Sequence, residues 1–100
     1  MNILKLVNGK LELRKDNGSL IRTLVSSGVE DANLNGDATL VIITTDKGKI
    51  ELRKENGSLV RTITSSGGKS AKFSGNDLLI SLTNGKTELR KESGSLIRTL

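Results

Sequence analysis

The 100-residue chain contains no cysteine, histidine, proline, tryptophan or tyrosine, and its single phenylalanine is Phe73. Without cysteine and histidine, Ser-His and Cys-His nucleophiles and thiolate or imidazole metal sites are excluded. The carboxylates recur at repeated positions, and no unique pair of them stands out as an acid and a base. We therefore expect a protein that is not an enzyme and that needs no cofactor.

Long apolar segments and an export signal are missing as well. The longest apolar run, residues 40–43, is far too short for a membrane helix, and the first residues lead directly into patterned sequence. We expect no membrane association and a cytoplasmic location. The net charge of +5 could attract nucleic acid. Single-strand binders, however, use aromatic stacking platforms, so a basic surface that aids solubility is the better interpretation.

What the chain does contain is one stretch that occurs three times. Residues 10–24 read KLELRKDNGSLIRTL, and they return with few changes at 49–63 and at 86–100. In each copy apolar and charged residues alternate, a short polar turn follows, and a second β-forming run completes the pattern. This pattern predicts a β-hairpin. The near-identity of the copies is typical of a recently amplified or engineered repeat.

The third copy indicates the type of turn. Ser93 stands where the other copies have Asn17 and Asn56. A two-residue type I′ turn needs a left-handed backbone at both central residues, which serine disfavours. We therefore expect a three-residue loop that ends in a left-handed glycine.

Such a loop also predicts the register of the hairpins. It pairs Lys15 with Ser19 in the first copy, and every later pair follows from that one. The expected pairs are Leu13 with Ile21, Glu12 with Arg22, Glu51 with Arg61, and Glu88 with Arg98. In this interpretation Arg22, Arg61 and Arg98 are cross-strand partners of glutamates and not a binding site.

The hairpins belong to a longer period that holds four short strands. Glu12 and Glu51 are 39 positions apart, and Glu51 and Glu88 are 37 apart. In the central period we expect strands at 29–34, 38–45, 50–54 and 58–64. The first period lacks its first strand, so the chain divides into a partial unit (1–28) and two full units (29–67 and 68–100). Four antiparallel strands in a period near 40 residues are typical of a propeller blade.

In its periodicity, strand order and turns the chain resembles a degenerate WD-repeat β-propeller. Leu-Arg-Lys stands at 13–15, 52–54 and 89–91, where that family has a hydrophobic residue followed by Trp-Asp. The resemblance implies an all-β fold of four-stranded antiparallel blades, about 2.75 of them per chain.

So few blades cannot close a ring, and an open array would leave apolar faces and strand edges bare. We therefore expect closure by homo-oligomerisation, with two chains approximating a six-bladed ring and three chains an eight- or nine-bladed one. The alternative fold is a β-solenoid of stacked repeats.

For function, the sequence favours a non-enzymatic repeat scaffold that assembles with itself, as a homodimer or homotrimer, and presents a rigid surface to other proteins. A ring would display the repeated cations as a basic band, formed by Arg14, Lys15, Arg53, Lys54, Arg90 and Lys91. Two alternatives remain: a small oligomeric carbohydrate-binding propeller, similar to a lectin, and weak nucleic-acid binding through the basic band. A steep fall of affinity with salt would indicate the nucleic-acid binder.

One further stretch has the pattern of a metal site. Residues 31–37 read DANLNGD, which matches the first half of a calcium-binding loop. The EF-hand version needs a glutamate at the position of Ile42, and it needs flanking helices. An Asn-Gly turn between two strands explains the same residues, so we expect no metal.

Overall fold

A computed structural model describes residues 2–100, which form eleven strands in three antiparallel sheets. Within each sheet the strands lie in the order of the chain. Sheet 1 contains β1 (Asn2–Val7), β2 (Lys10–Lys15) and β3 (Leu20–Val25). Sheet 2 contains β4 (Val29–Leu34), β5 (Leu40–Thr45), β6 (Ile50–Lys54) and β7 (Leu59–Thr64). Sheet 3 contains β8 (Gly68–Ser74), β9 (Asp77–Leu82), β10 (Thr87–Lys91) and β11 (Leu96–Thr99).

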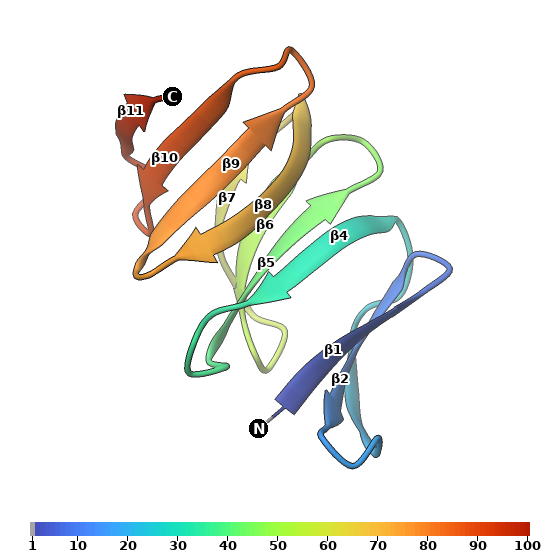
Figure 1. The fold of residues 1–100 in the computed structure, drawn as a ribbon. Coiled ribbons are helices and arrows are strands. Elements are labelled where there is room, and N and C mark those ends of the chain that lie inside the picture. Colours follow the sequence, from blue (N-terminus) through green and yellow to red (C-terminus); the bar gives the residue numbers. More distant parts are fainter. Residues whose placement is uncertain (1) are drawn as a thin grey trace.

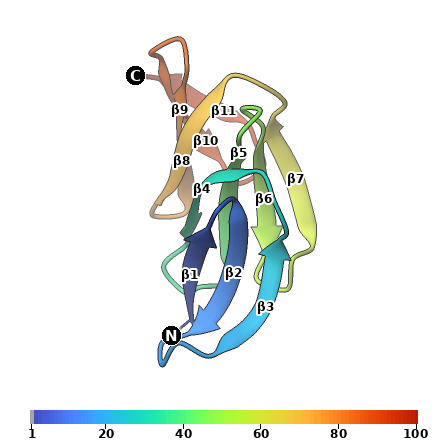
Figure 2. The ribbon, with the colours of Figure 1, turned by 90° about the vertical axis from the view of Figure 1, so that its right-hand side faces the viewer.

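The three sheets follow one another across an elongated molecule of 39 × 25 × 19 Å (Figure 1). The first sheet and the last lie at opposite ends, and sheet 2 lies between them (Figures 1 and 2). The all-β class predicted from the sequence is confirmed. The part of the chain that the structure describes holds no helix able to span a membrane.

Each sheet has two faces, because successive side chains of a strand point to opposite sides. We call the face that packs on the next sheet along the chain the forward face, and the face that packs on the preceding sheet the rear face. Two apolar clusters fill the two seams between sheets. The first joins Leu11, Leu13 and Leu24 of sheet 1 to Val29, Val41 and Ile43 of sheet 2. The second joins Ile42 and Ile50 of sheet 2 to Ala71, Leu78 and Ile80 of sheet 3.

Sheet 2 contributes to both seams, which explains the continuous apolar run of β5. Val41 and Ile43 lie in the first cluster, whereas Ile42 between them lies in the second. A strand that is covered on both faces needs apolar residues at every position. The run from Leu40 to Ile43 therefore marks the middle layer of the stack.

The predicted hairpin loop is confirmed in all three copies. In the first copy the Lys15 N–H donates to the Ser19 carbonyl at 2.8 Å, and the Gly18 N–H donates to the Lys15 carbonyl at 2.9 Å. Gly18, Gly57 and Gly94 have φ values of 93°, 94° and 90°. This left-handed backbone is open to glycine at little steric cost, which explains why glycine holds this position in all three copies while the residue before it varies between asparagine and serine.

The register predicted beyond the loop is wrong, because each hairpin contains a β-bulge. After Arg14 pairs with Leu20, Leu13 pairs with Arg22 instead of Ile21. A bulge places two residues of one strand opposite one of its partner and shifts the pairs beyond it by one position. In the first two hairpins a second irregularity shifts Leu11 and Ile50 by one position more. The first shift also separates the predicted glutamate–arginine pairs. Glu12, Glu51 and Glu88 instead lie opposite Thr23, Thr62 and Thr99.

The start of β5 also differs from the prediction. The expected strand began at Ala38, but Ala38 has a φ of 59° and β5 begins at Leu40. The side-chain carbonyl of Asn35 accepts the N–H groups of Thr39 and Leu40 at 2.9 and 3.0 Å. Since asparagine side chains compete with backbone partners in this way, the loop extends beyond the Asn-Gly turn.

Candidate interaction surfaces

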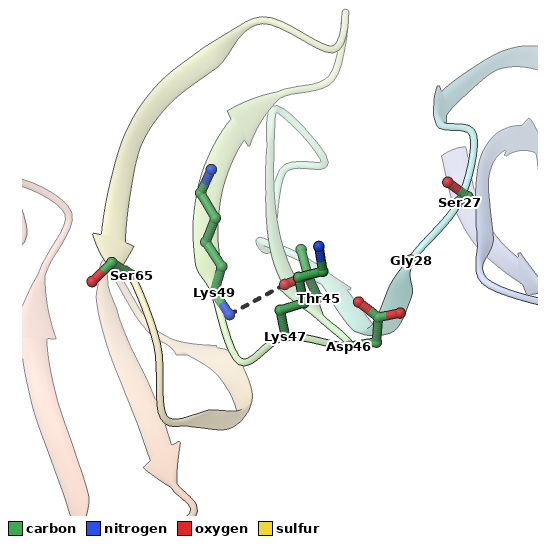
Figure 3. A pocket seen from close by; sticks show the side chains of 7 residues that line it. All are labelled: Ser27, Gly28, Thr45, Asp46, Lys47, Lys49 and Ser65. Carbon is green, nitrogen blue, oxygen red and sulfur yellow. Dashed lines mark hydrogen bonds between the residues drawn. The ribbon is translucent and has the colours of Figure 1, made fainter.

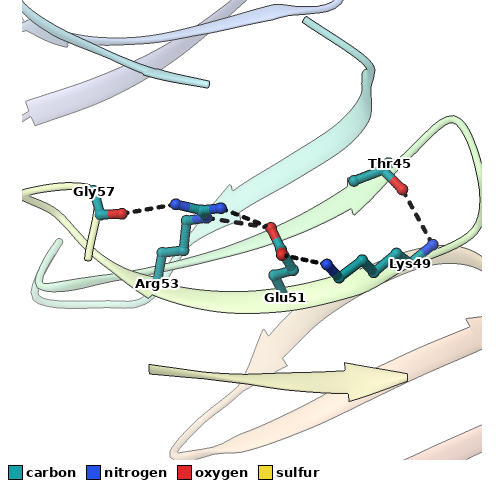
Figure 4. A network of polar contacts seen from close by, with 5 residues as sticks. All are labelled: Thr45, Lys49, Glu51, Arg53 and Gly57. Carbon is teal, nitrogen blue, oxygen red and sulfur yellow. Dashed lines mark hydrogen bonds and ion pairs between the residues drawn. The ribbon is translucent and has the colours of Figure 1, made fainter. Parts of the chain in front are cut away.

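Each sheet carries a row of charged side chains that we call the ladder; its members in sheet 2 are Lys49, Glu51 and Arg53 (Figure 4). Arg53 donates to one oxygen of Glu51 from Nη2 at 3.0 Å and from Nε at 3.2 Å. The Nζ atom of Lys49 lies 3.1 Å from the other oxygen. Arg53 Nη1 donates to the main-chain carbonyl of Gly57 at 2.8 Å and so ties the ladder to the hairpin loop.

The ladder forms because residues two apart on one strand share a face. The same arrangement recurs in sheet 1, where Lys10 and Arg14 contact Glu12 and Arg14 donates to the Gly18 carbonyl. In sheet 3, Arg90 contacts Glu88 and donates to the Gly94 carbonyl. The partners of the glutamates are therefore arginines and lysines two positions away along the chain.

In sheets 1 and 2 the ladder favours the ionised form of its glutamate. Hydrogen bonds from Arg14 and then from Lys10 lower the pKa of Glu12 below its usual 4.5. For Glu51, burial acts to raise the pKa, but hydrogen bonds from Lys49 and Arg53 outweigh it, so the pKa is lowered. Glu12 and Glu51 are only 4% and 6% exposed, so each carboxylate is sheltered by the cations that neutralise it.

The structure divides the six residues of the predicted basic band into two groups. Arg14, Arg53 and Arg90 are half-buried and already bind a carboxylate and a loop carbonyl. Each neighbouring lysine points to the other face of its strand and is exposed. The available part of the band is therefore a set of three lysines at equivalent strand ends: Lys15, Lys54 and Lys91.

The ladders of sheets 2 and 3 lie on rear faces, at the seams. Glu51 pairs with Ile43, which belongs to the first apolar cluster. Glu88 pairs with Ile80 of the second cluster. The ladder of sheet 1 lies on the corresponding rear face, since Glu12 pairs with Lys5 while Leu4 beside it packs toward sheet 2. No described sheet covers that face.

Polar contacts link the seam between sheets 2 and 3 at three places around its apolar centre. Asn33 Nδ2 on β4 donates to the Ala71 carbonyl on β8 at 2.7 Å. Arg61 Nη1 on β7 donates to the Ser93 carbonyl in the β10–β11 loop at 3.0 Å. At the β5–β6 turn, the Gly48 carbonyl accepts the Gly68 N–H at 2.8 Å. No pattern in the sequence predicted these contacts, because the repeats do not indicate which neighbouring sheet a given side chain contacts.

The seam between sheets 1 and 2 shares part of this pattern. The Val29 N–H donates to the Gly9 carbonyl of the β1–β2 turn at 3.0 Å. On the outer side, Leu24 of β3 lies against the β6–β7 loop, since a Cβ atom added to Gly57 would be 3.9 Å from its Cδ2 atom. In both seams the outer strand of one sheet thus contacts the hairpin loop of the next.

The two terminal faces expose residues whose counterparts are buried in the seams. Ile3 on the rear face of sheet 1 is 44% exposed, whereas its counterpart Val41 in sheet 2 is fully buried. On the forward face of sheet 3, Leu79 and Leu89 are half-buried. Their counterparts in sheet 2 are buried: Ile42 and Leu52.

A shallow cleft of about 510 Å³ opens beside the β5–β6 turn (Figure 3). Ser27 and Ser65 from the two links between sheets line it, together with Asp46 and Lys47 of the turn and Lys49. The Lys49 ammonium group is already paired with Glu51. One cation of the cleft is therefore engaged, and its other polar side chains come from Ser27, Ser65, Thr45, Asp46 and Lys47.

The calcium-like stretch is divided between a strand and a turn. Asp31 and Asn33 lie on β4, where Asn33 also makes its contact with sheet 3. In the turn, Asp37 accepts the Thr39 hydroxyl at 2.6 Å, and this bond lowers the pKa of Asp37. Among residues 2–100, no three carboxylates come together in a group that could hold a metal ion.

No protein-family model and no curated protein sequence matches the chain. Its structure is similar to the WD40 β-propeller domain of Doa1, with a TM-score of 0.71 and 18% sequence identity. The similarity covers 96% of this chain and 38% of that one. The chain thus spans well under half the length of the propeller it matches. At this identity the comparison bears on the fold alone, and it shows that the three sheets have the arrangement of blades in a WD40-type β-propeller.

Proposed function

We propose that the chain is a non-enzymatic scaffold module that associates with further copies of itself to form a closed propeller. The observation that carries this proposal is the pair of unmatched terminal faces. Ile3 is exposed where its counterpart Val41 is buried, and Leu79 and Leu89 are half-buried on the forward face of sheet 3. Rear faces pack on forward faces at both seams within the chain, so the same pairing between two copies would cover both ends.

The ladder on the rear face of sheet 1 is in a form that can be buried at a seam, whereas Lys5, at the position of the buried Ile43, would have to turn its ammonium group toward the rim. The ladder is neutralised within one strand, because Lys10 and Arg14 bind both oxygens of Glu12. A buried charge is costly mainly when its partners are missing, and here they are supplied before any association. The ladder of sheet 2 already lies at a seam in this paired form.

A closed assembly would hold its sheets rigidly and carry repeated surface groups at fixed spacing. The groups that remain available are Lys15, Lys54 and Lys91, because the arginines of the band are engaged. We propose that another protein with an acidic surface docks on these lysines, since charges of opposite sign speed encounter and set orientation.

The test is the native mass in solution, measured by light scattering on a sizing column. The chain has a mass of 10.7 kDa, and we expect one discrete small multiple of it. A monomer at all concentrations, or an open series of ever larger oligomers, would overturn the proposal.

A matched pair of variants locates the contact. Ile3→Glu places a charge on the rear face of sheet 1 and should give a folded monomer, because burial would remove the new carboxylate from water while Arg14 opposite it is already engaged with Glu12 and the Gly18 carbonyl. Leu59→Glu is the control, since Leu59 is similarly exposed but lies on the outer strand β7. The proposal requires that Leu59→Glu keeps the native mass and that both variants keep their β-sheet circular dichroism.

A further inference from the structure

At the outer edge of the seam between sheets 2 and 3, Arg61 of β7 contacts the β10–β11 loop. The chain carries an equivalent arginine in sheet 3 and an equivalent loop in sheet 1. Arg61 on β7 donates to the Ser93 carbonyl, and its aliphatic stem lies beside the same loop, 3.8 Å from a Cβ atom added to Gly94. In sheet 2, the arginine at this position of the outer strand therefore reaches the hairpin loop of the following sheet. Sheet 3 has the equivalent arginine but no described sheet after it.

The registers identify the equivalent residues. Arg61 pairs with Leu52 across β6 and β7, and Arg98 pairs with Leu89 across β10 and β11. Arg98 therefore lies on the forward face of sheet 3, and it is exposed. The loop of sheet 1 has the same backbone as the loop that receives Arg61, with Asn17 at the position of Ser93 and a left-handed glycine after each.

This inference rests on the proposed self-association and specifies its geometry. We propose that Arg98 of one copy donates a hydrogen bond to the main-chain carbonyl of Asn17 in a second copy, so that the copies join head to tail. The contact repeats the one that Arg61 makes within the chain. A main-chain carbonyl is present whatever the side chain, so the loop of sheet 1 can receive the arginine although it carries asparagine instead of serine.

The first test compares two arginine variants. Arg98→Ala should weaken association by about tenfold or more, the usual effect of losing one hydrogen bond from a charged group. Arg22→Ala is the matched control, because Arg22 occupies the equivalent position of β3 but faces sheet 2 of its own chain. Its association constant should stay within about twofold of the original, since it lies away from both terminal faces.

The second test uses the absence of cysteine from the chain. One preparation carries Arg98→Cys and another carries Asn17→Cys, and each is treated with a short bismaleimide cross-linker alone and after mixing. A head-to-tail seam should give covalent dimers in the mixture and almost none in either preparation alone. Arg22→Cys mixed with Asn17→Cys is the negative control.

The outcomes separate the two proposals. If the original chain assembles but Arg98→Ala associates as tightly and the mixture does not cross-link, the head-to-tail contact is wrong and self-association stands. Efficient cross-linking of Arg98→Cys with itself would also overturn it, because that result requires equivalent faces to meet. If the original chain is monomeric throughout, both proposals fail.

Discussion

Glu51 shows at the scale of one residue how a buried charge is accommodated. Its carboxylate is 6% exposed and is held by Arg53 of its own strand and by Lys49 just before that strand. Glu51→Gln should lower the free energy of unfolding at pH 7 by about 1 kcal/mol, because the two cations lose their charged partner. Urea unfolding measures the change. Glu55→Gln is the control, since Glu55 is exposed and should change stability by less than about 0.5 kcal/mol.

The same carboxylate predicts an acid dependence. Its pKa in the folded chain lies below the usual 4.5, so the unfolded chain takes up the proton first as the pH falls. The stability that Glu51 contributes is therefore complete above about pH 4.5 and is lost as the pH falls through the lower folded value. The difference between the original chain and Glu51→Gln should shrink between pH 5 and pH 3. An unchanged difference at pH 3 would contradict the assignment.

The sequence correctly predicted that the glutamates are paired with arginines, but it assigned the wrong arginines. Alternation placed Glu51 and Arg53 on one face of a strand, and that face was correctly expected to be charged. The predicted partner Arg61 instead reaches the loop of the next sheet. A glutamate can pair with an arginine along its own strand or across to the next strand, and both choices fit the same alternation of residues. Only the position of the bulge decides between them, and no residue type marks that position.

At the scale of the element, Gly68 at the start of β8 sets how closely one sheet approaches the turn of another. A Cβ atom added there would lie 2.6 Å from the side chain of Ile50 and 2.8 Å from the Gly48 carbonyl. Gly68→Ala should lower the free energy of unfolding by about 1–3 kcal/mol, because the core cannot take up the extra atom without moving β8. Chemical denaturation followed by circular dichroism measures the loss.

Gly36→Ala provides the matched comparison for Gly68→Ala. Gly36 has no left-handed backbone, and a Cβ atom added there meets nothing within 4 Å. Its stability should stay within about 0.5 kcal/mol of the original. Equal losses in the two variants would contradict the assignment of the effect to the close approach at Gly68.

Strand order, hairpin loops and sheet membership could be predicted because they depend on local pattern. The period-2 alternation and the glycine of each loop are visible in the printed residues. The start of β5 was missed by two residues because the Asn35 side chain takes the backbone groups that would have extended the strand. Contacts between sheets, such as Asn33 with Ala71, depend on the packing angle of whole sheets and could not be predicted.

At the scale of the whole molecule, self-association predicts that thermal stability depends on concentration. Folded copies that bind one another are stabilised by mass action, whereas an isolated monomer is not. For a dimer of 100-residue chains, each tenfold rise in concentration should raise the Tm by about 3–4 °C. Scanning calorimetry over two decades of concentration measures this shift. A constant Tm would indicate that sheets 1–3 are stable without a second copy.

The self-contained ladder has a consequence for how such a chain could grow. Residues 10–18 include the carboxylate, both of its cations and the loop carbonyl that receives the arginine. A gene segment that encodes one hairpin therefore encodes all the partners of its own buried charge. A tandem duplication of that segment adds a strand pair without leaving an unneutralised carboxylate in either copy. The array of strands can thus grow by in-frame copying of the hairpin before any compensating substitution has arisen.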